Sequence, residues 1–347
     1  AERSIDAQYY LLDNDVIGKV FLDSLLRAAD RGVRVRLLID DINTSDLKPK
    51  LAGLADHPNI ELRLFNPFAN RRFRFFSAWD FQRLNRRMHN KSLTVDNQVT
   101  LIGGRNIATE YFSFNDEYNF GDLDTLAVGP VVRDTSRMFD KYWNHDHAVP
   151  YEQLSGQEPD GGARLQAVRE TLVDNTESLQ DTPYAEAVRD SLEEYMEGGQ
   201  KRLIWAPYQL VYDSPDKSVS AELAEETPGI VTPLRRSVTS ARHSLLIVSP
   251  YFVLRPVNIQ NMKIMQDDGV QVDVLTNSLA SSDHLLVHSG YASTRKAILK
   301  TGARIYEVRG DLFIEGTDDA GHHGASSSLH TKAFIVDQRY FYMGSFN

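Results

Sequence analysis

The stretch His-Asn-Lys-Ser-Leu-Thr-Val-Asp at residues 89–96 recurs as His-Thr-Lys-Ala-Phe-Ile-Val-Asp at residues 330–337. In both copies, Lys follows His by two residues, Asp by seven, Gly by fourteen and Asn by seventeen. Four residue types at four matching offsets are hard to obtain by chance. An internal duplication of the chain is therefore predicted.

The segments before the two motifs repeat the same order of elements. Each half reads as a strand, a helix and a second strand, with Gly32 and Gly269 at equivalent helix-to-strand turns. The expected elements are 5–12, 15–29 and 33–39 in the first half and 244–254, 258–267 and 270–275 in the second. Because strands alternate with helices, the predicted fold is α/β, with two pseudo-twofold-related domains that each have a mixed β-sheet flanked by helices.

The chain of 347 residues is long enough for two domains of ordinary size. Residues 150–200 are acidic and polar with helical patches, which indicates a linker that carries surface helices. The predicted domains are residues 1–149 and 201–347, each with one motif, and a single active site at their interface. The first residues run directly into a strand and the last residue is the Asn of the second motif. We therefore expect the natural protein to extend upstream of Ala1 and downstream of Asn347, so that the second domain is truncated here.

Composition excludes several classes of function. The net charge of −10 argues against a general nucleic-acid-binding protein, which gains affinity from a basic surface. Since there is no cysteine, disulfides, Cys-ligated metals and thiol nucleophiles are excluded. No stretch approaches the roughly 20 apolar residues of a membrane-spanning helix.

The repeated residue types suit the cleavage of a phosphodiester. Residues i and i+2 of a strand point to the same face, so each His projects beside its Lys. Two copies would place two His, two Lys and two Asn around one point. The Lys and Asn side chains can hold the phosphate oxygens in place of a metal ion, while one imidazole attacks phosphorus and the other donates a proton to the leaving oxygen. No metal or cofactor is predicted.

At these residues the sequence resembles the phospholipase D superfamily, whose hallmark is a duplicated His-x-Lys-x4-Asp motif followed by Gly-[Gly/Ser]-x-Asn. Longer stretches narrow the resemblance to the bacterial cardiolipin synthases of the C type. The stretches that carry it are 31–41, 64–68, 83–92, 121–132 and 277–291. The resemblance implies a phospholipase-D-type fold in each half and transfer of a phosphatidyl group through a phosphatidyl-histidine intermediate.

The resemblance also implies roles for individual residues. His89 is expected to be the nucleophile and His330 the general acid and then base, with Lys91 and Lys332 beside them. Asp122 is expected to orient the nucleophilic His. Asn106, Ser345 and Asn347 are expected to bind the substrate phosphate. Asp96 and Asp337 are expected to have structural roles behind the reacting groups.

The family setting implies phospholipid partners at a membrane surface and no nucleic acid. The acceptor lipid would be phosphatidylglycerol, and the donor lipid would be phosphatidylethanolamine or phosphatidylglycerol. The enzyme would lie at the periphery of the bacterial inner membrane. The segment 68–81 interleaves aromatic residues with arginines, which is typical of an interfacial contact. The residues expected to contact the membrane are Phe75, Phe76, Trp79, Arg71, Arg72 and Arg74; the alternative is that the aromatics pack onto the core.

Two other enzymes fit the same motifs. A phospholipase D hydrolase would use water in place of the lipid acceptor and release phosphatidic acid. A nuclease of the superfamily is disfavoured by the net charge of −10. The motifs alone do not distinguish transfer from hydrolysis, because the difference lies in whether the cavity admits a lipid acceptor and excludes water.

Overall fold

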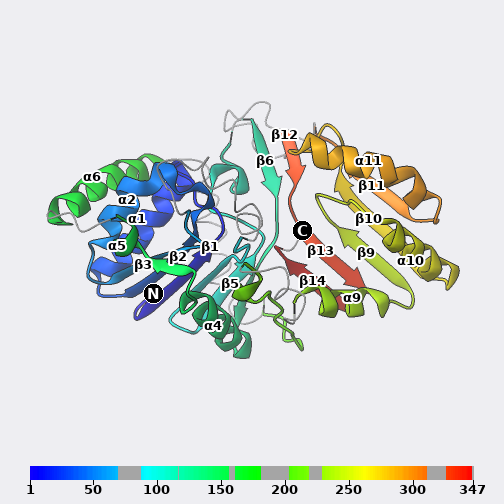
Figure 1. Cartoon of the computed structure of the whole chain (residues 1–347), viewed down its shortest axis with the longest axis horizontal. Helices are drawn as coiled ribbons and strands as arrows, with labels where there is room; N and C mark the ends of the chain where they lie inside the picture. Colours follow the sequence, from blue (N-terminus) through cyan, green and yellow to red (C-terminus); the bar gives the residue numbers. More distant parts are fainter. Residues whose placement is uncertain are drawn as a thin grey trace. The chain divides into compact units, whose positions relative to one another are not determined.

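A computed structural model of the chain describes residues 1–68, 87–115, 117–155, 161–180, 203–218, 229–310 and 326–345 (Figure 1). All six residues expected to contact a membrane lie outside these ranges, as does Asn347; they are Phe75, Phe76, Trp79, Arg71, Arg72 and Arg74. Among the helices within them, none is long and apolar enough to cross a bilayer.

The chain forms two compact units that alternate along the sequence. The first comprises Ala1–Met88, Leu93–Thr100 and Ala127–Leu210, and the second comprises His89–Ser92, Leu101–Leu126 and Val211–Asn347. This division differs from the expected boundaries at 149 and 200. Most of the segment around the first motif and its Gly-Gly-Arg-Asn tail groups with the C-terminal half of the chain.

A seven-stranded mixed sheet has the order β7-β5-β4-β1-β2-β3-β8. Its strands are β1 (Ser4–Tyr9), β2 (Arg34–Asp40), β3 (Ile60–Phe65), β4 (Ser92–Val95), β5 (Val99–Gly103), β7 (Asp124–Val128) and β8 (Ala148–Pro150). Strands β1, β2 and β3 are parallel, and β8 runs antiparallel to β3. Buried aliphatic residues along β2 and β3, such as Val35, Leu38 and Leu64, explain why these strands lie between layers.

Helices of the first unit pack on this sheet and on one another. They are α1 (Val16–Asp30), α2 (Lys48–Ala55), α4 (Pro130–Trp143), α5 (Tyr151–Ser155) and α6 (Gly161–Gln180), with short 3₁₀ turns η1 (Asp41–Asn43) and η2 (Ser45–Leu47). Helix α6, from the expected linker, packs against α1 and α2. It buries Leu172 completely and pairs Arg164 with Asp56 at 2.7 Å. This part of the expected linker is therefore integrated into the first unit.

The second unit contains a five-stranded sheet of order β11-β10-β9-β13-β14. Its strands are β9 (Ser244–Val248), β10 (Gln271–Asn277), β11 (Arg304–Val308), β13 (Lys332–Val336) and β14 (Tyr340–Gly344), and its helices are α9 (Val231–Thr239), α10 (Pro256–Asp267) and α11 (Leu285–Leu299). Strands β9, β10 and β11 are parallel, and β13 is antiparallel to β9 and β14. The order matches β3-β2-β1-β4-β5 of the first sheet, element for element, as the duplication predicts.

A two-stranded parallel sheet pairs the segment that precedes Asp122 with the segment that precedes the second motif. Strand β6 (Tyr118–Gly121) is parallel to β12 (Ser326–Leu329), with Gly121 opposite Leu329. The backbone N–H groups of His330 and Thr331 then both donate to the Gly121 carbonyl, at 2.9 and 3.1 Å. Two 3₁₀ turns, η4 (Thr109–Tyr111) and η6 (Pro215–Ser218), complete this unit.

Candidate active site

In the first motif, the lysine side chain folds back on its own histidine. Lys91 is 4% exposed, and its Nζ donates to the His89 carbonyl at 2.9 Å and lies 3.3 Å from His89 Nδ1. Both residues directly precede β4, and their side chains lie together, as the i, i+2 spacing predicts. The segment His89–Ser92 belongs to the second unit.

The second motif has the same arrangement. Lys332 is 4% exposed, and its Nζ donates to the His330 carbonyl at 2.7 Å and lies 3.1 Å from His330 Nε2. Burial lowers the pKa of Lys332 to about 8 because an ammonium loses hydration there. The two lysines thus supply positive charge in a largely desolvated place, which suits the binding of a phosphate.

The carboxylate of Asp122 contacts the imidazole of His330. Asp122 Oδ2 is 2.6 Å from His330 Nδ1, and both side chains are buried. The expectation that Asp122 orients the nucleophilic His89 is therefore wrong about its partner. The reason is topological: pairing of β6 with β12 places the residue after Gly121 beside the residue after Leu329.

Several charges act on His330. Burial lowers its pKa, the hydrogen bond with Asp122 opposes that change, and the positive charges of Lys332 and Lys91 lower the pKa further. With Nδ1–H donating to Asp122, the Nε2 of the neutral ring carries a lone pair that Lys332 can contact. The influence of Lys91 on His330 also means that residues of both motifs lie together within the second unit.

Two glycines of the first motif make room for carboxylates. A Cβ at Gly104 would overlap the Asp122 carboxylate, and a Cβ at Gly103 would overlap Asp124. Asp124 in turn pairs with Arg105 at 2.9 Å. The glycine at position fourteen of the motif and its neighbour therefore allow a close approach of the following acidic segment.

Aromatic side chains surround His330, and the sequence did not single them out. Asn106 Nδ2 donates to Tyr111 Oη at 2.8 Å, and the Tyr111 ring meets the His330 ring edge-on at 5.1 Å. Phe120 lies 5.0 Å from the same imidazole. Asn106 and Tyr111 are both buried, so they form a fixed wall beside His330. No spacing in the sequence marks Tyr111, whereas Phe120 lies on the strand that leads to Asp122.

A second group of residues lies at the carboxyl ends of β9 and β10. Tyr251 Oη donates to Asp283 at 2.7 Å, and the Tyr251 ring lies 5.8 Å from Lys332 Nζ. Asn277 bonds both the carbonyl and the N–H of Leu329, at 2.9 and 2.8 Å, directly before His330. Ligand sites form where parallel strands end, and that rule could have pointed to these positions.

The motif aspartates make backbone contacts away from the histidines. Asp96 accepts from the N–H groups of residues 2–4 at 2.7 to 2.9 Å, and Asp337 accepts from those of residues 242–244 at 2.8 to 3.1 Å. Both begin three-residue turns between paired strands, 96–98 and 337–339, and have positive φ, 54° and 53°, where short polar residues are favoured. Each thus pins the first strand of its own repeat. Ser345 is half-buried at the end of β14.

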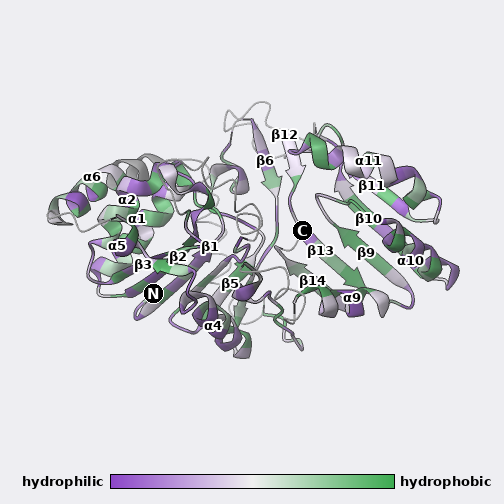
Figure 2. Cartoon of the chain, in the orientation of Figure 1, coloured by the Kyte–Doolittle hydropathy of each residue, from purple (hydrophilic) through white to green (hydrophobic). Residues whose placement is uncertain are grey.

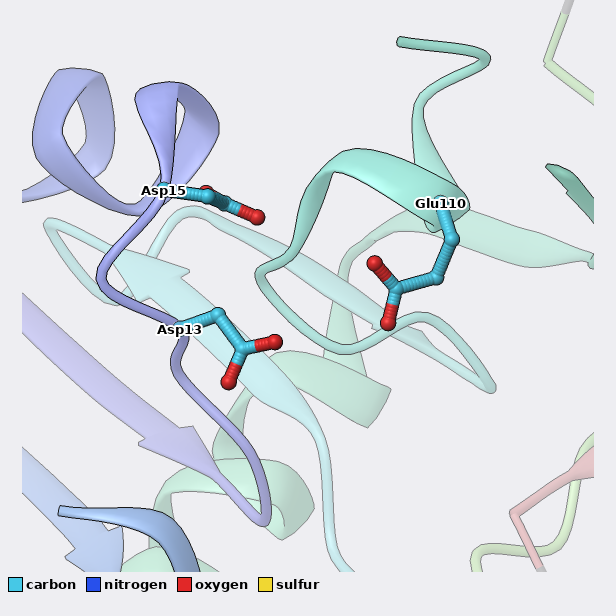
Figure 3. A group of neighbouring side chains, drawn as sticks. All are labelled: Asp13, Asp15 and Glu110. Atoms are coloured by element: carbon cyan, nitrogen blue, oxygen red, sulfur yellow. The ribbon is translucent and has the colours of Figure 1, made fainter. Parts of the chain in front are cut away.

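Three other acidic side chains are drawn in Figure 3. Asp15 caps α1 by accepting from Gly18 N–H at 2.8 Å, and Asp13 accepts a hydrogen bond from Asn43. Glu110 belongs to η4 in the other unit. Acidic residues such as these are common without an ion, so no metal site is assigned to them.

Comparison with known proteins agrees with the repeated motifs. The family model described as cardiolipin synthase, phospholipase-D-like domain, matches residues 1–143 and 234–347. The chain belongs to this cardiolipin synthase family. Cardiolipin synthase C of Escherichia coli K12 is 39% identical over the whole chain, which covers 73% of that protein. An uncharacterized protein of Helicobacter pylori 26695 is 30% identical over the whole chain and is covered to 68%.

A solved structure shares the fold of this cardiolipin synthase family member. Phosphatidylserine synthase of Haemophilus influenzae aligns with 98% of the chain and 72% of its own length, with a TM-score of 0.59 and 14% identity. The mixed sheets flanked by helices are therefore the two-part phospholipase-D-like fold that the sequence predicts. Phospholipids are the substrate class that membership of the family implies.

Proposed function

We propose that the chain is a cardiolipin synthase that transfers a phosphatidyl group through a covalent histidine intermediate. The observation that carries the proposal is the buried pair of Asp122 and His330, 2.6 Å apart, with Lys332 against the opposite ring nitrogen. A carboxylate on Nδ1 fixes the imidazole and stabilises its protonated form, which is what a proton-transferring histidine needs.

In the first half-reaction, a nitrogen of His89 attacks the phosphorus of the donor lipid. A P–N bond forms, the P–O bond to the headgroup breaks, and the leaving oxygen takes the proton from His330 Nε2. Binding of the anionic phosphate offsets the charges of Lys91 and Lys332. The pKa of His330 therefore rises from its lowered value, and the ring can carry that proton.

In the second half-reaction, a hydroxyl of phosphatidylglycerol attacks the same phosphorus. His330 takes the proton of this hydroxyl, the P–N bond breaks, and cardiolipin leaves. With phosphatidylglycerol as donor the by-product is glycerol; with phosphatidylethanolamine it is ethanolamine. Asn106 supports the oxygens of the phosphate, while the lysines neutralise its charge. We propose that the enzyme works at the periphery of the bacterial inner membrane, where it can reach its phospholipid substrates.

The test uses the protein on phosphatidylglycerol vesicles, with and without phosphatidylethanolamine, and lipid mass spectrometry. Cardiolipin should form with the wild-type protein and fall by roughly 10³-fold or more in His89→Ala. A rise in cardiolipin on adding phosphatidylethanolamine would identify it as the donor. Phosphatidic acid without cardiolipin would instead identify a hydrolase and contradict the proposal.

A further inference from the structure

Two segments at the carboxyl end of the second sheet expose large apolar side chains. We call residues 249–260 and 278–290 the docking loops. Leu286 is 88% exposed and Leu285 is 68% exposed, at the start of α11. Leu279, Val257 and Val253 are 62%, 54% and 46% exposed. Several exposed large apolar residues in two short segments are unusual unless the surface contacts something.

The docking loops form one surface. The hydrogen bond from Tyr251 to Asp283 links them, and the rings of Tyr251 and His284 lie 5.6 Å apart. Val253 also packs on α11, since its Cγ1 lies 3.3 Å from the place of a Cβ on Gly290, one turn after Leu286. The two docking loops that carry the exposed leucines and valines are therefore held together by direct contacts.

This surface adjoins the candidate active site. The Tyr251 ring faces Lys332 Nζ at 5.8 Å, and Asn277, next to the second loop, bonds the residue before His330. All these residues belong to the second unit. The first turn of α11 is green in Figure 2, where green marks hydrophobic residues.

The charge of the docking loops also differs from that of the chain. Although the net charge of the protein is −10, the loops contain a single acidic residue, Asp283, beside one arginine and two histidines. The Asp283 carboxylate is occupied by Tyr251. Arg255 is exposed on this apolar surface, whereas His284 lies 3.6 Å from Asp283 and His288 is half-buried against the Tyr291 ring. An exposed arginine beside apolar side chains suits a layer of anionic headgroups.

We propose that the docking loops insert into the surface of a phospholipid bilayer, with Leu285 and Leu286 below the headgroups. This inference rests on the proposed function, because it is a phospholipid substrate that requires a bilayer beside Lys332 and His330. A lipid could then enter the active site from the membrane without crossing water. The apolar side chains would gain binding free energy in proportion to the area they bury.

The test compares Leu285→Ser/Leu286→Ser with a control, Leu299→Ser, at the other end of the same helix. Leu299 is 49% exposed. Flotation with vesicles of phosphatidylglycerol and phosphatidylethanolamine measures binding, and dihexanoyl phosphatidylglycerol below its micellar concentration measures chemistry. We expect the double variant to bind vesicles roughly tenfold or more weakly. Its activity on the dispersed lipid should stay at the wild-type level, and the control should match the wild type in both assays.

Unchanged vesicle binding by the double variant would overturn the inference, as would an equal loss in the control. Leu286→Trp gives an independent readout that does not depend on loss of binding. Its tryptophan emission should shift to the blue on adding vesicles, and the absence of a shift relative to the wild type would contradict insertion. If the wild type makes no cardiolipin from either lipid form, the proposed function fails, while flotation still decides the docking inference by itself.

Discussion

At the scale of single residues, the chemistry depends on which histidine each charged group contacts. Asp122 contacts His330, and Lys332 contacts the same imidazole from the other side. The ring is therefore held between a negative and a positive group while its surroundings exclude water. Each of these contacts can be removed separately, so the roles of the two charged groups can be measured apart.

Replacing Asp122 by Asn should lower kcat by roughly 10²- to 10⁴-fold, because His330 loses the charge that stabilises its protonated form. Cardiolipin formation from phosphatidylglycerol vesicles is the measurement. Asp124→Asn is a matched control, since Asp124 pairs with Arg105 and not with a histidine. Wild-type activity in Asp122→Asn, or an equal loss in both variants, would exclude the assigned role.

The lowered pKa of Lys332 predicts a pH dependence of anion binding. Because this pKa is about 8, Lys332 is charged below pH 8 and loses its proton as the pH rises above it. Sulfate keeps its charge over this range, so its inhibition constant should rise between pH 7 and 9 in the wild type. Lys332→Arg keeps its charge and should show no such rise. A flat inhibition constant in the wild-type protein would contradict the lowered pKa.

At the scale of elements, the two hairpins β4–β5 and β13–β14 carry the motifs and are fixed by the same device. Asp96 and Asp337 sit in their turns and bond the N–H groups that precede β1 and β9. In each repeat, the hairpin that carries the His-Lys pair is therefore attached through its turn to the start of the neighbouring strand. Gly103 at the end of β5 and Gly104 after it add a second constraint, because they allow the segment of Asp122 and Asp124 to approach closely.

Gly104→Ala should reduce activity roughly tenfold or more, because its Cβ displaces the Asp122 carboxylate from His330. Cardiolipin formation is compared with that of Gly162→Ala, at a site where a Cβ meets nothing within 4 Å. The pH profile of Gly104→Ala should resemble that of Asp122→Asn. Full activity in Gly104→Ala would show that the close approach is not required.

Asp96→Asn should destabilise the protein by about 1 kcal/mol at pH 7, because three N–H groups lose a charged acceptor while the residue still tolerates the positive φ. Its backbone hydrogen bonds lower the pKa of Asp96 in the folded state. The stabilisation is therefore present above the unfolded pKa and is lost as the pH falls through the folded one. Urea unfolding of variant and wild type should converge toward acid pH, whereas exposed Asp267→Ala should change little at either pH. A difference independent of pH would contradict this linkage.

At the scale of the whole molecule, the sequence predicted the fold class and the duplication, because both follow from periodicity and from repeated offsets. The partner of Asp122 was predicted wrongly. Sequence spacing from Asn106 locates this carboxylate but does not indicate which strand its segment pairs with, and pairing of β6 with β12 decides that. The two compact units are each built from separate segments of the chain, which local sequence patterns do not indicate. Tyr111 and Tyr251 lie beside His330 and Lys332 through tertiary packing that no local pattern predicts.

The most direct test of the central claim is to trap the covalent intermediate. A phosphatidyl donor with a p-nitrophenol leaving group needs no proton from an acid, so His330→Ala should still form the intermediate but should not activate an acceptor. Peptide mass spectrometry after rapid quenching should then find the phosphatidyl group on His89. An adduct on another residue, or none while p-nitrophenol is released, would contradict the account.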